Sequence, residues 1–507
     1  MSTKVFDTDK RIRLGIWGLG RGANFVQSAK FLNIDVVAGC DIHPEIRERF
    51  QNAVPEAFCT ADEKEFLAYD MDAVLVATYL PDHARHSIMA LEAGKHVMCE
   101  VTAFRTPADA VKLVEAVEKS GKVYNMLENY PFTPACMYMK KLYQEGYFGE
   151  FMYGEFEYLH ECRTLTYGYN VYPVSLPVEP GWTVHNWRST LNIHLYCTHS
   201  LGPAMFITGT RPVSVSAVRD EVTLPGYLRH ASAAPSIVKM SNGALVRNLM
   251  GSTTLDCHNG MRFWGTKAAA ESREPGKLNI CCGAFGGGLL MDVEPEIDEL
   301  AKLAADAAHG GGDFWELYYF AREILTGEPA PGNIYASCDV TMTGIMAIRS
   351  EKQGGKSIRI PDMRNPGDRE LCRYDCEDEL PFHHEHIFPE GHDPAVTGEF
   401  STVMTKLFPI LPGGLNVFNA AINGIRLYDN IKNDKAKFDL LKCLNTALKE
   451  LPEIAENCRK AERIRDAYPD CIAGKMLTEM LAAQDLKRIY DVEGTAAELI
   501  KWRDSCK

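Results

Sequence analysis

The most constraining feature of the sequence is a glycine-punctuated turn between two apolar segments near the N-terminus. Residues 13–17 are typical of a short strand, and Gly18, Gly20 and Ala23 follow it in the spacing G-x-G-x-x-A. In such a turn one glycine permits a tight bend, the next lets the backbone approach a pyrophosphate, and the small third residue packs the following helix against the strand. The phosphate then lies on the exposed amides at the start of that helix. The spacing predicts a dinucleotide-binding turn, and the alternative is a similar domain that holds no nucleotide.

A second apolar segment, residues 34–40, leads to Asp41, which lies about twenty residues after the turn, at the spacing of a ribose-binding acid. A carboxylate at this place can accept hydrogen bonds from both ribose hydroxyls of NAD, and it would repel the 2'-phosphate of NADP. We therefore predict NAD rather than NADP. The predicted cofactor contacts of the turn are Gly18, Gly20, Arg21, Gly22, Ala23 and Asp41.

Alternating strand-like and helix-like segments continue as far as Asn129, which is the pattern of a doubly wound parallel sheet. Ligands bind at the carboxyl ends of the strands in such sheets. The further candidate contacts at these strand ends are Thr78, Tyr79, Pro81, His83, Glu100 and Asn129. For any one of them taken alone, a structural role is an equally good interpretation.

Composition excludes several classes of protein. A chain of 507 residues is long enough for two or three domains. Its formal charge of -14 leaves no global field to attract nucleic acid, and no apolar run is long enough to span a bilayer. The 16 cysteines include no C-x-x-C pair, which argues against a zinc ribbon, an iron–sulfur site and a thioredoxin-like motif. Because no segment of signal-peptide type precedes the first strand, we expect a cytoplasmic protein with free thiols.

The segment DAVLVATYLPDHARHSIMALEAGKHVMCE, residues 72–100, resembles the Gfo/Idh/MocA oxidoreductases. The resemblance covers about residues 10–365 and includes the segments THSLGPAMFITG, HGGGDFWELYYFAREILTGEPAP and GGKSIRIPD. It implies an α/β protein with an N-terminal Rossmann domain that binds NAD, followed by an α+β domain with an open, mainly antiparallel sheet. The free face of that sheet commonly makes oligomers in this family, so we expect a homo-oligomer.

One departure from the family pattern concerns the residue after Glu100. The family usually has Lys-Pro there, and the lysine is credited with holding and polarising the reacting hydroxyl, whereas this chain has Val101. A Glu-Val-x-Ala element of this kind is familiar from the NAD-dependent α-N-acetylgalactosaminidases, glycoside hydrolase family 109. Residues 126–163 and 185–203 are also similar to that subgroup. The resemblance therefore points to the glycosidase branch of the family.

Similarity to the subgroup also implies which side chains move protons. These are Tyr158, in the Tyr-x-His segment, and His199, in the Thr-His-x-Leu-Gly-Pro segment, with Tyr196 and His160 nearby. The implied substrate contacts are His185, Trp187 and Arg188. For each of these residues, ordinary packing is the alternative interpretation. The chain has Leu-Asn-Ile-His before Tyr196 where the subgroup usually has Arg-Asn-Gly-Asn, so N-acetylgalactosamine is only one candidate sugar.

The predicted function is NAD-dependent hydrolysis of a small-molecule glycoside through transient oxidation at C3. Histidine is suited to take the hydroxyl proton because its ordinary pKa lies close to working pH, which favours His199 as the base, and Tyr158 is predicted to act at C2. Elimination of the aglycone, addition of water and re-reduction complete the cycle without the paired carboxylates of ordinary glycosidases. The alternatives are an NAD-dependent sugar or cyclitol dehydrogenase that releases NADH, and a cofactor-sensing protein without turnover.

We predict three domains: a Rossmann domain over residues 1–129, a substrate-binding and oligomerisation domain over 130–365, and a loop with a helical extension over 366–507. The extension contains a cluster of potential metal ligands, namely His383, His384, Glu385, His386, His392 and Asp393. Their spacing matches no established metal site, and we predict no metal. A lid over the sugar site and an ordinary surface loop are the alternatives.

Overall fold

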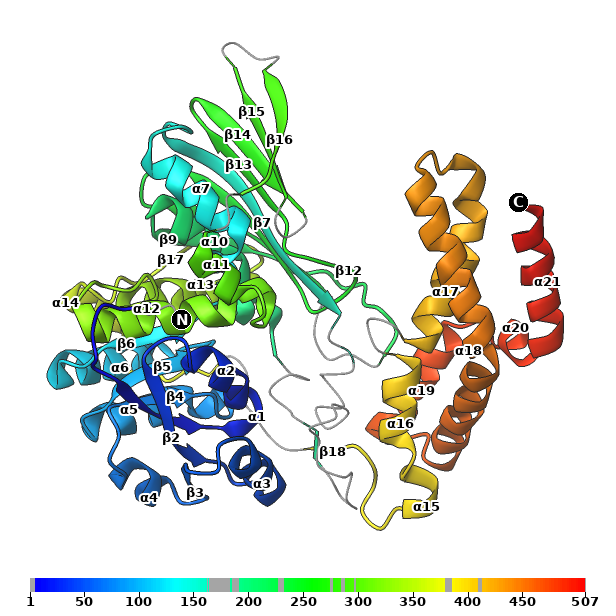
Figure 1. The fold of residues 1–507 in the computed structure, drawn as a ribbon, viewed down its shortest axis with the longest axis horizontal. Helices are drawn as coiled ribbons and strands as arrows, with labels where there is room; N and C mark the ends of the chain where they lie inside the picture. The colour runs from blue at the N-terminus through cyan, green and yellow to red at the C-terminus, as the bar shows by residue number, and fades with distance from the viewer. Residues whose placement is uncertain are drawn as a thin grey trace. The chain divides into compact units, whose positions relative to one another are not determined.

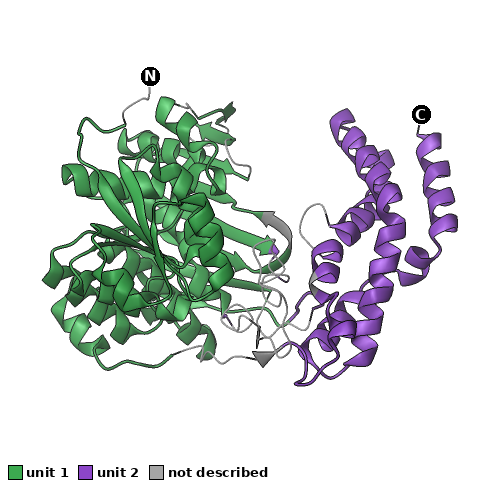
Figure 2. Cartoon of the chain, turned by 60° about the horizontal axis from the view of Figure 1, so that its bottom comes forward, with its two compact units in different colours: residues 1–160, 192–221, 231–381 green, residues 161–191, 222–230, 382–507 purple. Residues whose placement is uncertain are grey.

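A computed structural model of the chain describes residues 5–161, 163, 183–184, 191–226, 232–273, 277–283, 288–295, 298–378, 385–408 and 413–506. The chain forms two compact units (Figure 2). The first comprises residues 1–160, 192–221 and 231–381, and the second comprises residues 161–191, 222–230 and 382–507. The division into three domains at residues 129 and 365 stays a prediction.

The N-terminal part of the first unit is a six-stranded parallel sheet with the strand order β3-β2-β1-β4-β5-β6 (Figure 1). This is the order of a doubly wound dinucleotide-binding fold, so the predicted Rossmann domain is confirmed. The strands are β1 (Ile12–Trp17), β2 (Ile34–Cys40), β3 (Phe58–Thr60), β4 (Ala73–Val76), β5 (His96–Glu100) and β6 (Tyr124–Leu127). Every residue of β4 and β6 is buried, as expected for strands covered on both faces.

Helices connect these strands, and their ends follow from local sequence. The α6 helix begins after Thr106, whose side chain accepts a hydrogen bond from the amide of Asp109, and it ends at Gly121 with φ 63°. The helical segments of this part are α1 (Leu19–Gly22), η1 (Ala23–Phe25), α2 (Val26–Ala29), α3 (Pro44–Ala53), α4 (Glu63–Ala68), η2 (Leu80–Asp82), α5 (His83–Glu92) and α6 (Pro107–Ser120).

The second sheet of this unit has the order β16-β15-β14-β13-β7-β11-β10-β9-β17, with β12 also paired to β7. Its strands are β7 (Phe151–Glu161), β9 (Pro212–Ala217), β10 (Ala233–Met240), β11 (Leu245–Gly251), β12 (Thr253–His258), β13 (Met261–Gly265), β14 (Ala268–Ser272), β15 (Leu278–Cys282), β16 (Leu289–Val293) and β17 (Ile358–Arg359). The β7–β11 pair is parallel, whereas β13, β14, β15 and β16 pair with antiparallel neighbours, as do β9, β10 and β17. The predicted mainly antiparallel sheet is confirmed.

One face of this sheet is covered and the other is more exposed. Along β7, Phe156 and Tyr158 are buried, while Glu155 and Glu157 alternate with them on the opposite face and are only partly buried. Helices α7 and α10 lie against the covered face (Figure 1). Tyr158 therefore points toward the interior of the unit.

The remaining helices of the first unit connect its two sheets and pack against them. They are η3 (Tyr130–Phe132), α7 (Pro134–Gln144), η5 (Ile193–Tyr196), α10 (Thr198–Thr208), α11 (Glu299–Ala304), η6 (His309–Gly311), α12 (Gly312–Thr326), α13 (Ile334–Lys352) and α14 (Pro366–Cys372). Phe314 and Phe320 of α12 share one hydrophobic core with Leu14 and Ile16 of β1. This packing brings the start of α12 close to the glycine turn.

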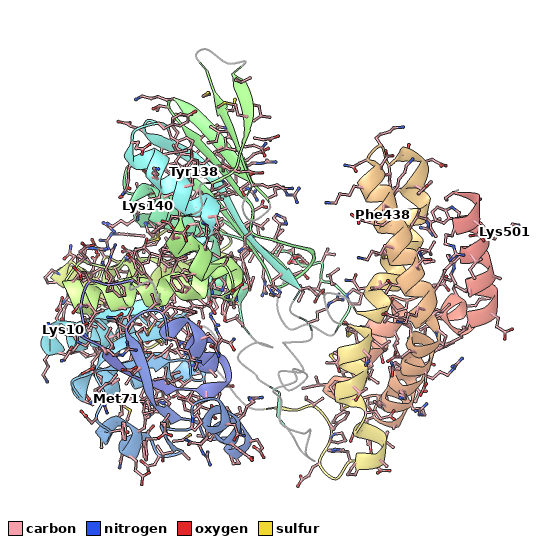
Figure 3. All side chains as sticks on the ribbon, viewed as in Figure 1. Lys10, Met71, Tyr138, Lys140, Phe438 and Lys501 are labelled. Atoms are coloured by element: carbon pink, nitrogen blue, oxygen red, sulfur yellow. The ribbon has the colours of Figure 1, made fainter. Side chains whose placement is uncertain are left out.

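The second unit is mainly helical, as predicted for the C-terminal region. It contains the short β8–β18 pair (Thr183–Val184 with Glu385–His386) and the helices α15 (Pro394–Thr397), α16 (Phe400–Leu407), α17 (Gly414–Leu427), η7 (Tyr428–Asn430), α18 (Asp434–Ala467), α19 (Ile472–Ala482), α20 (Leu486–Tyr490) and α21 (Val492–Ser505). Leu451, Ile454 and Met476 lie in its core, whereas Phe438 and Lys501 are exposed side chains of α18 and α21 (Figure 3).

Three sequence expectations concern metals, thiols and membranes. Within the described residues, no cluster of His, Cys, Asp and Glu could hold a metal ion, and His383 and His384 lie outside those residues. The cysteines that the structure places are free thiols. In the same part of the chain, no helix is both long enough and apolar enough to cross a membrane.

Candidate active site

The geometry of the glycine turn would let a ligand approach the protein backbone closely. Gly18 adopts φ 92°, and a Cβ atom there would lie 2.3 Å from the carbonyl oxygen of Ala77, so only glycine fits. A Cβ atom on Gly22 would lie 2.4 Å from Cγ2 of Ile16, because the helix packs tightly on β1. A Cβ atom on Gly20 would meet nothing within 4 Å, so the space next to this residue is open.

Asp41 lies beside this turn, directly after β2. Its Oδ2 accepts a hydrogen bond from the amide of Leu19 at 2.8 Å, and its Oδ1 accepts one from the amide of His43 at 2.9 Å. Arg47 donates to the main-chain carbonyl of Asp41 at 2.7 Å rather than to the carboxylate. Each carboxylate oxygen keeps further acceptor capacity, so the group is fixed in place and can still bind hydroxyls.

The residues after β4 that are predicted to contact the cofactor lie in a local network of hydrogen bonds. The hydroxyl of Thr78 lies 2.7 Å from Nδ1 of His86. The two ring nitrogens of His83 lie 3.0 Å from the carbonyl oxygen of Thr102 and 3.2 Å from that of Thr78. Since His83 is only 2% exposed, its ring stabilises the loop that carries Thr78 and Tyr79.

A chain of charged groups leads from the glycine turn to the start of α12. Arg21 Nε donates to Glu100 at 2.7 Å, and the two terminal nitrogens of Arg21 donate to Asp313 at 2.5 and 3.0 Å. Nδ1 of His309 lies 2.7 Å from the same carboxylate. Burial alone would raise the pKa of Asp313, but the hydrogen bonds from His309 and Arg21 outweigh it and lower that pKa to about 2. Asp313 is therefore anionic at neutral pH.

Glu316 lies one helical turn after Asp313 and has a different environment. Its side chain is 4% exposed, and neither carboxyl oxygen has a hydrogen-bond partner in the described part of the chain. Burial, followed by the negative charges of Asp313 and Glu100, raises the pKa of Glu316 well above its ordinary value. The environment of Glu316 therefore favours the protonated form of its carboxyl group.

The central pair of the site consists of Glu128 and His199. Nδ1 of His199 lies 2.8 Å from Oε1 and 3.0 Å from Oε2 of Glu128. Glu128 follows the last residue of β6, and His199 is the second residue of α10. A Cβ atom on Gly202, one turn after His199, would lie 3.1 Å from Cγ of Glu128, so a small residue there lets α10 approach the sheet. The exposed fractions are 8% for Glu128 and 7% for His199, so the pair is buried.

Aromatic rings surround this pair. The ring centroid of His199 lies 4.6 Å from that of Tyr158, 4.8 Å from that of Tyr130 and 5.2 Å from that of Tyr196. The ring of His160 lies 5.8 Å from that of Tyr158. The structure thus brings the four predicted catalytic side chains into one cluster. The three predicted substrate contacts, His185, Trp187 and Arg188, lie outside the described residues.

Several residues of the cluster are not among the sequence predictions. Asn129 is the predicted contact after β6, yet its neighbour Glu128 is the residue that pairs with His199. The other unpredicted members are Tyr130, His309, Asp313 and Glu316. The motif HGGGDFWE contains three of them, and this combination of a histidine and two acids beside glycines is the signal that could have identified them.

Comparison with known proteins agrees with this geometry. Residues 12–127 match the model of an oxidoreductase family with an NAD-binding Rossmann fold, GFO_IDH_MocA. The chain is also 25% identical over 414 residues to a glycosyl hydrolase family 109 protein of Stenotrophomonas maltophilia (strain K279a), which covers 71% of this chain and 90% of the relative. A glycosyl hydrolase family 109 protein of Shewanella putrefaciens (strain CN-32 / ATCC BAA-453) is 24% identical, with 69% of this chain and 84% of the relative covered.

Residues 12–127 thus carry the NAD-binding Rossmann domain of the Gfo/Idh/MocA oxidoreductases, and most of the chain is similar to glycosyl hydrolase family 109 proteins. The match to an NAD-binding oxidoreductase family supports an NAD-dependent enzyme, and the similarity to glycosyl hydrolase family 109 proteins supports the branch that resembles them. The Gfo/Idh/MocA fold is also found in levoglucosan dehydrogenase in complex with NADH and levoglucosan. That structure has a TM-score of 0.57 and 17% sequence identity, and the match covers 69% of this chain and all of that chain.

The residues of the turn fit the NAD that this family binds. Gly18 and Gly20 leave the main chain accessible where a pyrophosphate would lie, and the carboxylate of Asp41 is fixed beside them. An acidic group there suits ribose hydroxyls and disfavours a phosphate. The fold and the residues of the turn therefore both indicate NAD as the cofactor.

Proposed function

We propose that this enzyme is an NAD-dependent glycoside hydrolase that oxidises C3 of a sugar transiently, eliminates the aglycone, adds water and reduces the ketone again. The observation that carries the proposal is the buried Glu128–His199 pair with the ring of Tyr158 against it, near the carboxyl end of β6. The names of the family 109 relatives support hydrolysis of a glycoside as the net reaction. No carboxylate pair of the ordinary glycosidase kind is needed for it.

Cofactor binding is assigned to the turn and to Asp41. The main chain at Gly18 and Gly20 would hold the pyrophosphate, and Asp41 would accept the ribose hydroxyls. Bound NAD supplies a hydride acceptor that returns the hydride at the end of the cycle. We place Thr78, Tyr79, Glu100 and Asn129 around the same site because they lie at the carboxyl ends of its strands, and the buried His83 supports this site by holding the loop that carries Thr78 and Tyr79.

His199 is the proposed base for the C3 hydroxyl. A proton on Nδ1 is shared with Glu128 at 2.8 Å, which leaves Nε2 as the acceptor. A carboxylate that holds one ring nitrogen selects this tautomer and stabilises the imidazolium that forms when the hydroxyl proton arrives. Glu128 is therefore the residue that orients the base.

Tyr158 is the proposed acid–base group at C2. The ketone at C3 makes the C2 proton acidic, and removal of this proton allows the C1–oxygen bond to the aglycone to break. By then His199 is cationic, and its ring lies 4.6 Å from that of Tyr158, so it stabilises a phenolate. Tyr196 and His160 complete the wall of this part of the site.

The decisive experiment offers a panel of aryl α- and β-glycosides to the purified enzyme with its NAD. Released aglycone, NADH absorbance and exchange of the C2 proton with deuterium from the solvent are followed together. We expect many turnovers of aglycone with no net NADH and with C2 exchange. Accumulation of NADH without aglycone would contradict the proposal and identify a sugar dehydrogenase.

One variant and its matched control separate the oxidation at C3 from the proton transfer at C2. Tyr158→Phe keeps the ring but removes the hydroxyl, so we expect it to form NADH in a single turnover while C2 exchange and aglycone release are lost. The matched control is Tyr153→Phe, a tyrosine on the same strand whose side chain points to the opposite face of the sheet. The control should behave like the unaltered enzyme.

A further inference from the structure

We propose that His309 is a second acid–base residue of this site and that it protonates the oxygen of the departing aglycone. The inference rests on the proposed function, because a sugar dehydrogenase that only oxidises its substrate releases no aglycone. It assigns a role to a residue outside the Glu128–His199–Tyr158 cluster.

The imidazole of His309 is held by one ring nitrogen and exposed elsewhere. Nδ1 lies 2.7 Å from Oδ1 of Asp313, whose side chain is only 1% exposed and is clamped by two hydrogen bonds from Arg21. The side chain of His309 is itself 37% exposed. Within the described residues Nε2 has no recorded partner, so it can exchange a proton with a ligand or with water.

Tyr130 connects this imidazole to the central pair. The centroid of its ring lies 4.8 Å from that of His199 and 6.2 Å from that of His309. Two histidine–carboxylate pairs therefore flank one tyrosine; the imidazole of His199 is buried, whereas that of His309 is partly exposed to solvent. The buried imidazole suits a hydroxyl of the enclosed sugar, and the exposed one suits the aglycone, which must leave into solvent.

The backbone at His309 is unusual for a residue with a side chain. His309 adopts φ 55°, and the next two residues, Gly310 and Gly311, adopt φ 63° and 96°. Three successive residues are thus in the left-handed region, where glycine is favoured and histidine is among the few residues with a side chain that are enriched. This backbone presents the imidazole to Asp313, which fits a side chain retained for function.

The step balances in atoms and electrons. In the C3 ketone, the C2–H bond breaks and its proton goes to Tyr158, while the electron pair forms the C1–C2 double bond. The C1–oxygen bond breaks, and the proton on Nε2 of His309 moves to the aglycone oxygen, so the aglycone leaves as an alcohol. In the return half, water adds to C1 and gives its proton to His309, and C2 recovers its proton from Tyr158.

A poor leaving group depends on protonation by an acid more than a good leaving group does, and the test uses this difference. We would compare His309→Asn and His309→Gln with the unaltered enzyme on a 4-nitrophenyl glycoside and on the methyl glycoside of the same sugar. Asparagine tolerates a left-handed backbone, so His309→Asn should fold even if glutamine disturbs the turn. The matched control is His258→Gln, because His258 pairs with Glu157 on the opposite face of β7 from Tyr158.

We expect both His309 variants to release methanol roughly 100-fold more slowly or worse, the range of general acid catalysis, and nitrophenol less than about fivefold more slowly. Exchange of the C2 proton should continue in both variants, since it precedes departure of the aglycone. Equal losses on the two glycosides, or no loss on either, would overturn the assignment of His309. If the unaltered enzyme shows neither C2 exchange nor aglycone release, the proposed function itself fails.

Discussion

Glu316 makes a quantitative prediction possible because its carboxyl group is buried without a partner. An acid whose pKa is raised in the folded state keeps its proton when the unfolded chain has already lost it. The folded state then binds one more proton than the unfolded state, so the stability contributed by Glu316 is complete below the unfolded pKa and is lost as pH rises toward the folded pKa. Glu316→Gln keeps the shape of the side chain and removes the ionisation.

The size of the effect follows from linkage. Between the ordinary pKa of a glutamate, about 4.3, and its raised value in the fold, stability falls by about 1.4 kcal/mol for each pH unit. The pKa of Glu316 is raised well above its ordinary value, first by burial and then by Asp313 and Glu100. From pH 5 up to the folded pKa of Glu316, the unaltered protein should therefore lose stability steadily relative to Glu316→Gln.

Urea unfolding of both proteins at pH 5, 6 and 7 measures this difference, with Trp315 of the same helix as a buried fluorophore. The free energy of unfolding of Glu316→Gln minus that of the unaltered protein should grow with pH and level off at the folded pKa of Glu316. Glu299→Gln is the control, because the side chain of Glu299 is 83% exposed and the difference should stay constant. A constant difference for Glu316→Gln as well would refute the raised pKa of this carboxyl group.

Three further variants test the cofactor turn and the central pair. Gly18→Ala places a Cβ atom 2.3 Å from a carbonyl oxygen, so this variant should show no NAD binding in calorimetry. The control is Gly121→Ala, where φ is 63° but the space around the Cβ atom is open; this variant should lose about 1 kcal/mol of stability and still bind NAD. Asp41→Ser should weaken NAD binding roughly 10- to 100-fold, the value of hydrogen bonds to a charged acceptor, and should improve NADP binding; unchanged preference would contradict the assigned contact. Glu128→Gln should lower kcat roughly 100- to 10,000-fold with little change in melting temperature, because His199 loses its orienting carboxylate.

The Rossmann sheet is predictable from sequence because its signals are local. Each strand is an apolar run followed by a turn, and the spacing from Gly18 to Asp41 depends only on one strand–helix–strand unit. The exact residue at a strand end is less predictable. The β6 strand ends at Leu127, and the side chain that reaches His199 belongs to Glu128, one position before the predicted Asn129. A shift of one residue at a strand end changes the direction of the side chain.

Long-range pairs carry no local signal. Glu128 and His199 are 71 positions apart, and Arg21 and Asp313 are 292 positions apart. Their contacts depend on how α10 and α12 pack against the first sheet, which no period in the sequence reveals. His309 illustrates the same limit, since its role emerges only once Asp313 and Tyr130 are found beside it.

The charge of the site explains how it can work without a lysine after Glu100. Arg21 is neutralised by Glu100 and Asp313, so its guanidinium is not a free cation for a substrate hydroxyl. In the proposed mechanism the hydroxyl proton goes instead to His199, which is backed by the carboxylate of Glu128.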